Sequence, residues 1–296
     1  TTSRPRRRSG NKSGRRRARA GSRRARRTIR RQSAGASRRR NRRGSKIGAI
    51  KKKFAFPEAL KIVGSSLAKF GPQYAEMLDN FARRGQIDVY PRQGKTGGAY
   101  CSGLNQHPTF LLLNHVDDIR SVETLAHEMG HAIHTELSKK QLPHYRGYST
   151  ATAEVASTFF EQLAIAKLEQ HLSDKEKLIF LHNRLLGDIS TIFRQIACFN
   201  FELELHQRIR EAGQLDKEEI AKLLAKHLRS YTGAAMKVTS DDGYFFVSWS
   251  HIRRFFYVYS YACGQLVSRA LYEKWKADPS YATKIEQFLK AGCSMS

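Results

Sequence analysis

The 296-residue sequence predicts a mainly α-helical fold with a small β-sheet. Apolar residues recur at helical spacing in several segments, and these segments begin at proline or at capping residues. Only residues 86–105, rich in glycine and tyrosine, and the apolar run 109–114 have the character of short strands and loops. We therefore expect a helical domain with a small sheet placed before its central helix.

Two short amphipathic helices are expected first, over residues 57–69 and 72–84. Pro57 and Pro72 each suit the first turn of a helix, where the missing backbone N–H has no partner to lose. Gly71 lies between the two segments and favours a break. This helix pair should precede the sheet.

Longer helices are expected over about 118–139 and 150–171, joined by a loop that contains Pro143 and Gly147. Most of the remaining chain is also expected to be helical. Its helix starts are marked by capping-box spacing or by an N-cap followed by proline, at Ser173 with Glu176, Asp216 with Glu219, and Asp278 before Pro279.

The formal charge of +27 is concentrated at one end of the chain. Residues 1–50 contain 21 Lys and Arg and no Asp or Glu. The other 246 residues hold the remaining 32 of the 53 basic residues and all 26 acidic ones, a net charge of +6. The high isoelectric point is therefore a property of the N-terminal segment and says little about the folded part.

Residues 1–46 are expected to form a disordered Arg-rich tail, because they contain too few apolar side chains to offset the entropy cost of ordering. Three interpretations stay open. The tail could bind nucleic acid by neutralising phosphates. It could be a solvated extension without a function. It could also be foreign to the fold, translated from upstream of the true start of the reading frame. It has no interleaved aromatic residues, which specific RNA recognition would need.

The composition favours a cytoplasmic protein. There is no apolar run of eighteen residues that could cross a membrane, and no apolar stretch follows the basic N-terminus as in a secretory signal. The cysteines are widely spaced and form no C-x-x-C pair, so reduced thiols are expected at Cys101, Cys198, Cys263 and Cys293.

The central chemical feature is the segment 127–131, with the sequence HEMGH. Residues four apart share one face of a helix, so His127 and His131 can both reach a single Zn²⁺. Glu128 is rotated by about 100° around the axis, where its carboxylate can take a proton from a zinc-activated water. The helical context is supported by a continuous apolar set, namely Val122, Leu125, Ala126, Met129, Ala132 and Ile133. Polar side chains set among these would be costly to bury unless paired or ligated.

A catalytic zinc site needs a third protein ligand and one open position. The extended motif with a third histidine six residues on is excluded, because Leu137 stands there. Glu154 opens the next expected helix, 23 residues after His131, and its small and apolar neighbours favour burial. Glu161, two turns farther on, is the competing ligand. Glu123, one turn before His127, could accept the second ring N–H of a ligand histidine and fix its tautomer.

An aromatic segment farther along carries further polar candidates. His251, Tyr257 and Tyr261 could donate hydrogen bonds to an oxyanion. Tyr257 and Tyr261 are four residues apart and share a helix face, whereas Tyr259 faces elsewhere. Spacing alone favours an aromatic core helix over a catalytic role.

Taken together, the motifs resemble the oligoendopeptidase F group of the thimet-oligopeptidase family of zinc metallopeptidases. The resemblance covers residues 50–296 and rests on four segments: Gly98–Gly103, His127–His134, Glu154–Ser157 and Phe256–Tyr261. It implies a helical zincin-type catalytic domain that binds one Zn²⁺ per chain and cleaves oligopeptides inside a channel. The oligomeric state is left open.

The resemblance also implies roles for individual residues. His127, His131 and Glu154 would be the metal ligands, and Glu128 the general base. His251 with Tyr257 or Tyr261 would bind the substrate carbonyl and its oxyanion. The strand near 109–113 would pair with the backbone of the bound peptide.

The sequence departs from the family pattern in three places. Relatives carry a long helical N-terminal region where this chain has its Arg-rich tail, and they continue past the segment near Cys293. Ser250 and Ile252 flank His251 where Pro and Phe are expected. We therefore expect a catalytic domain truncated at both ends. The alternatives are a zinc carboxypeptidase of related helical fold, or an inactive fragment that binds nucleic acid through its tail.

The tail interpretation makes one testable prediction. If residues 1–46 bind nucleic acid, the full chain should bind duplex DNA with an affinity that falls roughly 10³-fold or more between 50 and 200 mM salt. Deleting residues 1–46 should abolish this binding in fluorescence anisotropy titrations. Equal binding by the full and the shortened chain would reject the nucleic-acid interpretation.

Overall fold

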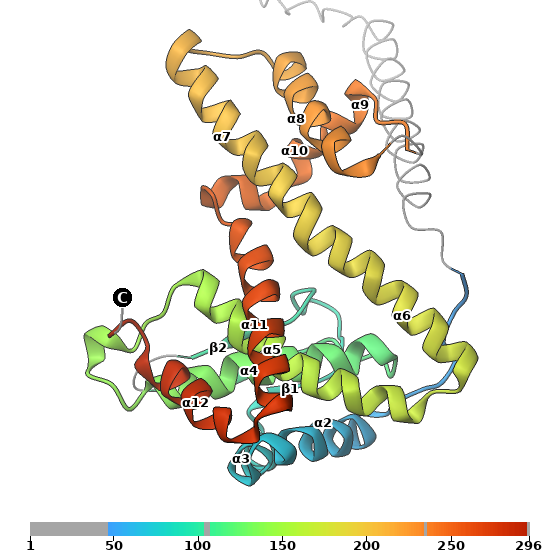
Figure 1. Cartoon of the computed structure of the whole chain (residues 1–296), viewed down its shortest axis with the longest axis vertical. Coiled ribbons are helices and arrows are strands. Elements are labelled where there is room, and N and C mark those ends of the chain that lie inside the picture. The colour runs from blue at the N-terminus through green and yellow to red at the C-terminus, as the bar shows by residue number, and fades with distance from the viewer. Residues whose placement is uncertain (1–46, 104–106, 234–235, 295–296) are drawn as a thin grey trace, which may run out of the picture. The chain divides into compact units, whose positions relative to one another are not determined.

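The computed structural model describes residues 47–103, 107–233 and 236–294 (Figure 1). The basic segment 1–46, for which disorder was predicted, lies outside these residues. The described part is mainly helical with one small sheet, as predicted. Within it, no helix is both long enough and apolar enough to span a bilayer.

The two N-terminal helices are α2 (Phe56–Phe70) and α3 (Pro72–Arg83). Proline occupies the first turn of each, and Gly71 adopts an extended conformation between them. Both helices bury an apolar face in the main core. The predicted boundaries are confirmed to within one residue, because proline and glycine act locally on the backbone.

Three short strands form the sheet, in the order β1-β3-β2. β1 (Ile87–Asp88) pairs in parallel with β3 (Phe110–Leu112), and β2 (Tyr100–Ser102) pairs antiparallel with the other side of β3. The middle strand therefore has both sides occupied. Within the described segments, the outer edge of β2 pairs with no other strand, and β2 packs against α4.

The two central helices match their predictions. α4 (Ile119–Ser138) is capped by Asp118, whose side chain accepts the N–H of Ser121 at 2.8 Å. After the short 3-10 helix η1 (Pro143–Tyr145), α5 (Thr150–Leu168) begins at its cap Ser149. The last three predicted residues form a separate 3-10 turn, η2 (Glu169–His171).

The rest of the described chain is helical, and both predicted capping boxes are present. The proline after Asp278 starts a 3-10 turn rather than the α-helix that its spacing predicts, and the helix begins at Ala282. The elements are α6 (Asp174–Ile189), the π-helical η3 (Ser190–Arg194), α7 (Gln195–Ala212), α8 (Lys217–Thr232), α9 (Ser240–Gly243), α10 (Phe245–Ser248), η4 (Ser250–Arg254), α11 (Tyr259–Ala277), η5 (Pro279–Tyr281) and α12 (Ala282–Ala291).

Two apolar cores hold residues 47–294 together. The main core gathers side chains of α2–α5 and α12 with the sheet, and the second gathers those of α7, α8 and the segment leading into α11. α11 runs from the second core along α5, and η5 joins its end to α12 (Figure 1). This helix therefore links the two cores.

Two glycines allow helices to approach closely around α5. A Cβ at Gly130 of α4 would lie 2.7 Å from Ser157 Cα and 2.9 Å from the carbonyl oxygen of Ala156. A Cβ at Gly264 of α11 would lie 2.6 Å from the Cβ of Glu154. Both contacts are mainly with backbone or with the root of a side chain, which cannot swing away. Only glycine fits at these positions.

Replacing Gly130 with alanine should therefore destabilise the fold although alanine favours helix. We expect Gly130→Ala to lower the free energy of unfolding by about 1–3 kcal/mol, the usual cost of overpacking. Gly64→Ala is the matched control, because its new Cβ would meet only a Leu78 methyl at 3.9 Å. That change should instead add about 0.5–1 kcal/mol. Urea denaturation of both variants measures these changes in the free energy of unfolding. Changes of the same sign in the two variants would contradict the prediction.

Candidate metal centre

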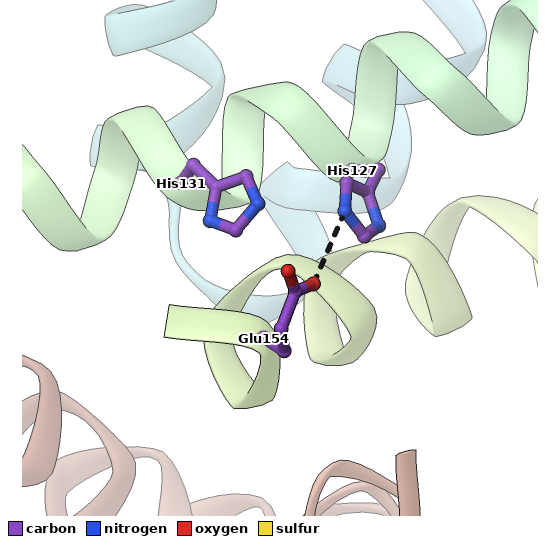
Figure 2. A group of neighbouring side chains, drawn as sticks. All are labelled: His127, His131 and Glu154. Carbon is purple, nitrogen blue, oxygen red and sulfur yellow. Dashed lines mark ion pairs between the residues drawn. The ribbon is translucent and has the colours of Figure 1, made fainter. Parts of the chain in front are cut away.

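The predicted ligands converge at one point. His127 and His131 project from the same face of α4, with ring centroids 5.0 Å apart, and Glu154 reaches toward them from α5 (Figure 2). Glu154 Oε2 lies 3.5 Å from His127 Nε2. Each residue offers one ligand atom, and these atoms all lie within 4.8 Å of one another. Among the described residues, this is the group of histidine and acidic side chains that could hold a metal ion.

Local structure explains how Glu154 reaches this point. The Ser149 cap starts α5 one turn earlier, so Glu154 lies in the well-formed part of the helix. Gly264 lets α11 pack directly against the Cβ of Glu154, which leaves the side chain one open direction. Ser157 Oγ donates to Glu154 Oε2 at 3.2 Å and fixes the carboxylate. Glu154 is 7% exposed.

The electrostatics of the centre favour a positive charge between its ligands. Burial by itself would lower the pKa of His127, but the carboxylates of Glu154 and Glu161 raise it to about 10. Burial and the charge of His127 lower the pKa of His131 to about 4. Burial would raise the pKa of Glu154, yet its bond to His127 brings it below its usual value. These are the properties of a cation site with two imidazoles and one anionic oxygen.

The partner of the outer nitrogen of His127 is Glu161. Glu161 lies two turns after Glu154 on α5. Its Oε2 lies 2.9 Å from His127 Nδ1. The sequence proposed Glu123 for this role, and Glu161 as a rival ligand. Instead Glu161 orients His127, and Glu123 lies beside it, with a pKa raised to about 8 by burial and by Glu161. The i, i+7 spacing predicts that Glu154 and Glu161 share a face of α5. The spacing does not predict which of the two is the ligand and which orients His127.

Glu128 has the environment of a general base. It is 7% exposed, and its Oε2 has no hydrogen-bond partner among the described residues. The carboxylate accepts the backbone N–H of Cys101 from β2. Burial raises the pKa of Glu128 to about 7, against the opposing charge of His127. One of its oxygens is therefore held by the sheet while the other is free for a proton.

A cavity of about 720 Å³ joins these groups. Its lining includes His127, Glu128 and Glu154, together with Tyr261 from α11. Residues around β2 and the end of β3, such as Ala99 and Asn114, line another part of it. The ligand cluster thus opens into a space large enough for part of a small molecule or peptide.

The strand beside the site is β2, and the expectation that the strand near 109–113 pairs with a substrate is wrong. β3 cannot accept another strand, because β1 and β2 flank it. The N–H groups of Leu111 and Leu113 bond to the β1 side. Cys101 stands opposite Leu111, so its backbone groups point away from β3, toward the free edge and Glu128.

The aromatic candidates form one cluster, of which Tyr261 lines the cavity. His251 Nε2 lies 3.1 Å from the Tyr261 hydroxyl, and the Tyr257 ring packs 5.4 Å from His251 and 5.5 Å from Tyr261. Burial and nearby arginines lower the pKa of His251, so its ring is neutral. Burial and a bond to Tyr257 raise the pKa of Tyr261, so it stays a donor. His251 and Tyr257 contact Tyr261 from behind and do not line the cavity.

The residues present fit a zinc ion. Two imidazoles and one carboxylate, with a fourth direction open, make up the ligand set of catalytic zinc sites. The outer nitrogen of His127 bonds to the carboxylate of Glu161. Zinc-bound histidines usually donate their second ring N–H to a carboxylate, a backbone carbonyl or water in this way. The buried, unpartnered oxygen of Glu128 is accounted for if a water molecule lies at that open direction.

Comparison with known proteins identifies a family of peptidases. The model of peptidase family M3 matches residues 38–296. Oligopeptidase PepF of Bacillus subtilis is 33% identical over 248 residues, which are 82% of this chain and 37% of the relative. An oligoendopeptidase F homologue of Borreliella burgdorferi is 32% identical, over 82% of this chain and 42% of its own length. The chain therefore spans about two fifths of the relatives that it matches.

Solved structures show the same fold. A peptidase of Chlamydophila abortus has a TM-score of 0.69 at 28% identity, over 83% of this chain and 42% of its own. Oligoendopeptidase F of Enterococcus faecium has a TM-score of 0.55 at 21% identity, over 81% and 37%. With the family model covering most of the sequence, the chain belongs to peptidase family M3, where its relatives are oligoendopeptidase F homologues.

Proposed function

We propose that this chain carries the catalytic site of a zinc endopeptidase that hydrolyses oligopeptides. The convergence of His127, His131 and Glu154 beside the buried, half-free carboxylate of Glu128 carries the proposal. A zinc ion held by these three ligands would polarise the scissile carbonyl and acidify a water molecule. The relatives' names, oligopeptidase and oligoendopeptidase, support a peptide substrate.

Glu128 is proposed as the general base. Its pKa of about 7 lets it take a proton from water and later deliver it to the leaving amine. The N–H of Cys101 holds one carboxylate oxygen, so the other stays directed at the site. On the far side of the cavity, the Tyr261 hydroxyl is a candidate donor to the carbonyl oxygen, with His251 and Tyr257 supporting it.

The free edge of β2 is proposed to bind the peptide backbone. An extended peptide laid along this edge would pair with main-chain groups other than the Cys101 N–H, which Glu128 already accepts, and would pass directly in front of Glu128. Backbone pairing is independent of side chains, which suits an enzyme that accepts many oligopeptide sequences.

We also propose that residues 50–296 form the catalytic domain and that further protein completes it. The coverage of only about two fifths of each relative supports this, as do exposed apolar side chains on α6 and η3, namely Leu178, Leu181, Leu185 and Phe193. A cytoplasmic location is proposed from the bacterial relatives and from the four cysteines, which are all free thiols.

Metal content tests the centre directly. The purified chain, reconstituted with Zn²⁺ and dialysed, should retain about one ion per chain, and His131→Ala should retain none. Glu161→Gln should weaken zinc affinity about 10–100-fold, because His127 loses the anion that orients it. The exposed His144→Ala is the matched control and should bind normally. Full zinc occupancy in the His131 variant would reject the site.

Turnover tests the base. Glu128→Gln should retain zinc but cleave an internally quenched oligopeptide at least about 100-fold more slowly, because the amide cannot accept the proton. Glu76→Gln, an exposed change on α3, should behave like the wild type. The substrate should carry a blocked C-terminus, which an endopeptidase tolerates and a carboxypeptidase does not. Unchanged cleavage by a zinc-loaded Glu128→Gln chain would defeat the proposal.

A further inference from the structure

The turn that leads into α11 has an unusual backbone. Phe255 and Phe256 both have positive φ, at 36° and 54°, and neither is glycine. Two consecutive bulky residues in this region are strained, so the surrounding structure must hold them there. The turn immediately precedes Tyr257 and follows η4, which carries His251.

One face of α7 holds this turn. The side chains of Phe199, Glu202 and His206 recur at i, i+3 and i+7 and all contact Phe256. The two aromatic rings lie 5.8 and 5.0 Å from its ring. Between them, Glu202 Oε1 accepts the backbone N–H of Phe256 at 2.8 Å. This is the polar contact that fixes the backbone of the turn.

Glu202 is a destabilising residue at this buried position. It is 0% exposed and lies on α7 among apolar members of the second core, including Phe201 and Leu205. Its second oxygen, Oε2, has no hydrogen-bond partner among the described residues. A buried carboxylate that is only half satisfied lowers stability, so an apolar side chain would suit the core better. Its presence calls for a reason outside core packing.

The turn is connected to the cavity through a short chain of contacts. The carbonyl of Tyr257 accepts the N–H of Ser260 at 3.2 Å and its hydroxyl at 2.6 Å, which starts α11. One turn on, Tyr261 lines the cavity and meets His251 at 3.1 Å. A shift of the turn at Phe256 would therefore move both partners of this hydrogen bond relative to each other.

We propose that Glu202 is a positioning residue for the proposed peptidase reaction. By accepting the Phe256 N–H, it holds the left-handed turn that sets His251 against Tyr261, the member of the pair that lines the cavity. It touches neither substrate nor metal, and it acts through the backbone. The inference rests on the proposed function for its catalytic consequence, but its structural step stands on contacts within the described residues.

Three variants separate positioning from bulk stability. Glu202→Gln keeps an accepting oxygen at the same place, whereas Glu202→Leu removes it and fills the space with apolar atoms. Leu205→Ala, three residues on along α7, is the matched control, since it weakens the same core without contacting Phe256. Zinc content should be unchanged in all three.

The expected kinetics differ between the variants. For zinc-loaded protein and a quenched oligopeptide, Glu202→Leu should lower kcat about 10–100-fold, the usual consequence of misplaced groups, with KM changed less than about threefold. Glu202→Gln should stay within about threefold of wild type in both constants. Leu205→Ala should lower the melting temperature but leave kcat unchanged. Wild-type kcat in the Leu variant, or equal losses in Gln and Leu, would overturn the proposal.

A second readout does not need turnover. In protein with ¹³C-labelled histidine, the His251 signal, assigned from a His251→Gln spectrum, should shift in Glu202→Leu and stay in place in Glu202→Gln. The signals of His127 and His131 should not move in either. If wild-type chain with full zinc cleaves no peptide, the proposed function fails, and this spectrum still decides the positioning role. An unmoved His251 signal in the Leu variant would overturn it.

Discussion

The close packing of α5 against both α4 and α11 is the constraint on which the centre depends. A ligand set drawn from two helices requires their backbones to approach more closely than ordinary side chains permit. Gly130 allows this between α4 and α5, and it lies inside the HEMGH segment, one residue before His131. Gly264 allows it between α11 and α5, against Glu154 itself. The arrangement of the candidate ligands thus depends on these two glycines as well as on the ligand side chains.

The buried acids around this packing have different tasks because their environments differ. Glu154 and Glu161 both contact His127, which keeps Glu154 ionised as an anionic ligand. Glu128 has burial without a direct cationic partner, so the pKa of its carboxylate rises to about 7, where it can accept and release a proton. The pKa of Glu123 is raised further, to about 8, by burial and by the charge of its neighbour Glu161. The same type of side chain is thus suited by its position to different proposed roles: ligand for Glu154, orienting group for Glu161 and base for Glu128.

The parts of this site that the sequence could predict are those encoded within a helix turn or by a family motif. The pair His127 and His131 follows from i, i+4 spacing, and the helix limits follow from caps, prolines and glycines that act on adjacent residues. The errors at the site involve long-range pairing. Whether Glu123 or Glu161 reaches His127 depends on the rotation of α5 against α4. The strand order β1-β3-β2 depends on which short strands meet, and two- or three-residue strands carry almost no register information.

Glu202 shows the same limit more sharply. The local sequence gives no sign that Glu202 differs from any other acidic residue of an amphipathic helix. Its hydrogen-bond partner, the backbone N–H of Phe256, is 54 residues away along the chain. Only the fold reveals that its carboxylate meets a backbone N–H in a left-handed turn. The periodicity of side chains predicts which residues share a helix face. It does not predict a hydrogen bond to a backbone N–H of another element.

The two cores separately support the residues with proposed catalytic roles. The metal ligands and Glu128 belong to helices anchored in the main core, whereas Tyr257 and Tyr261 pack against the second. Their relative placement depends on α11, which meets α5 at Gly264 and meets α7 through the turn held by Glu202. A shift at either contact would change the distance between Tyr261 and the ligands without altering a single ligand. The placement of Tyr261 relative to the candidate ligands therefore depends on residues that lie outside the ligand cluster.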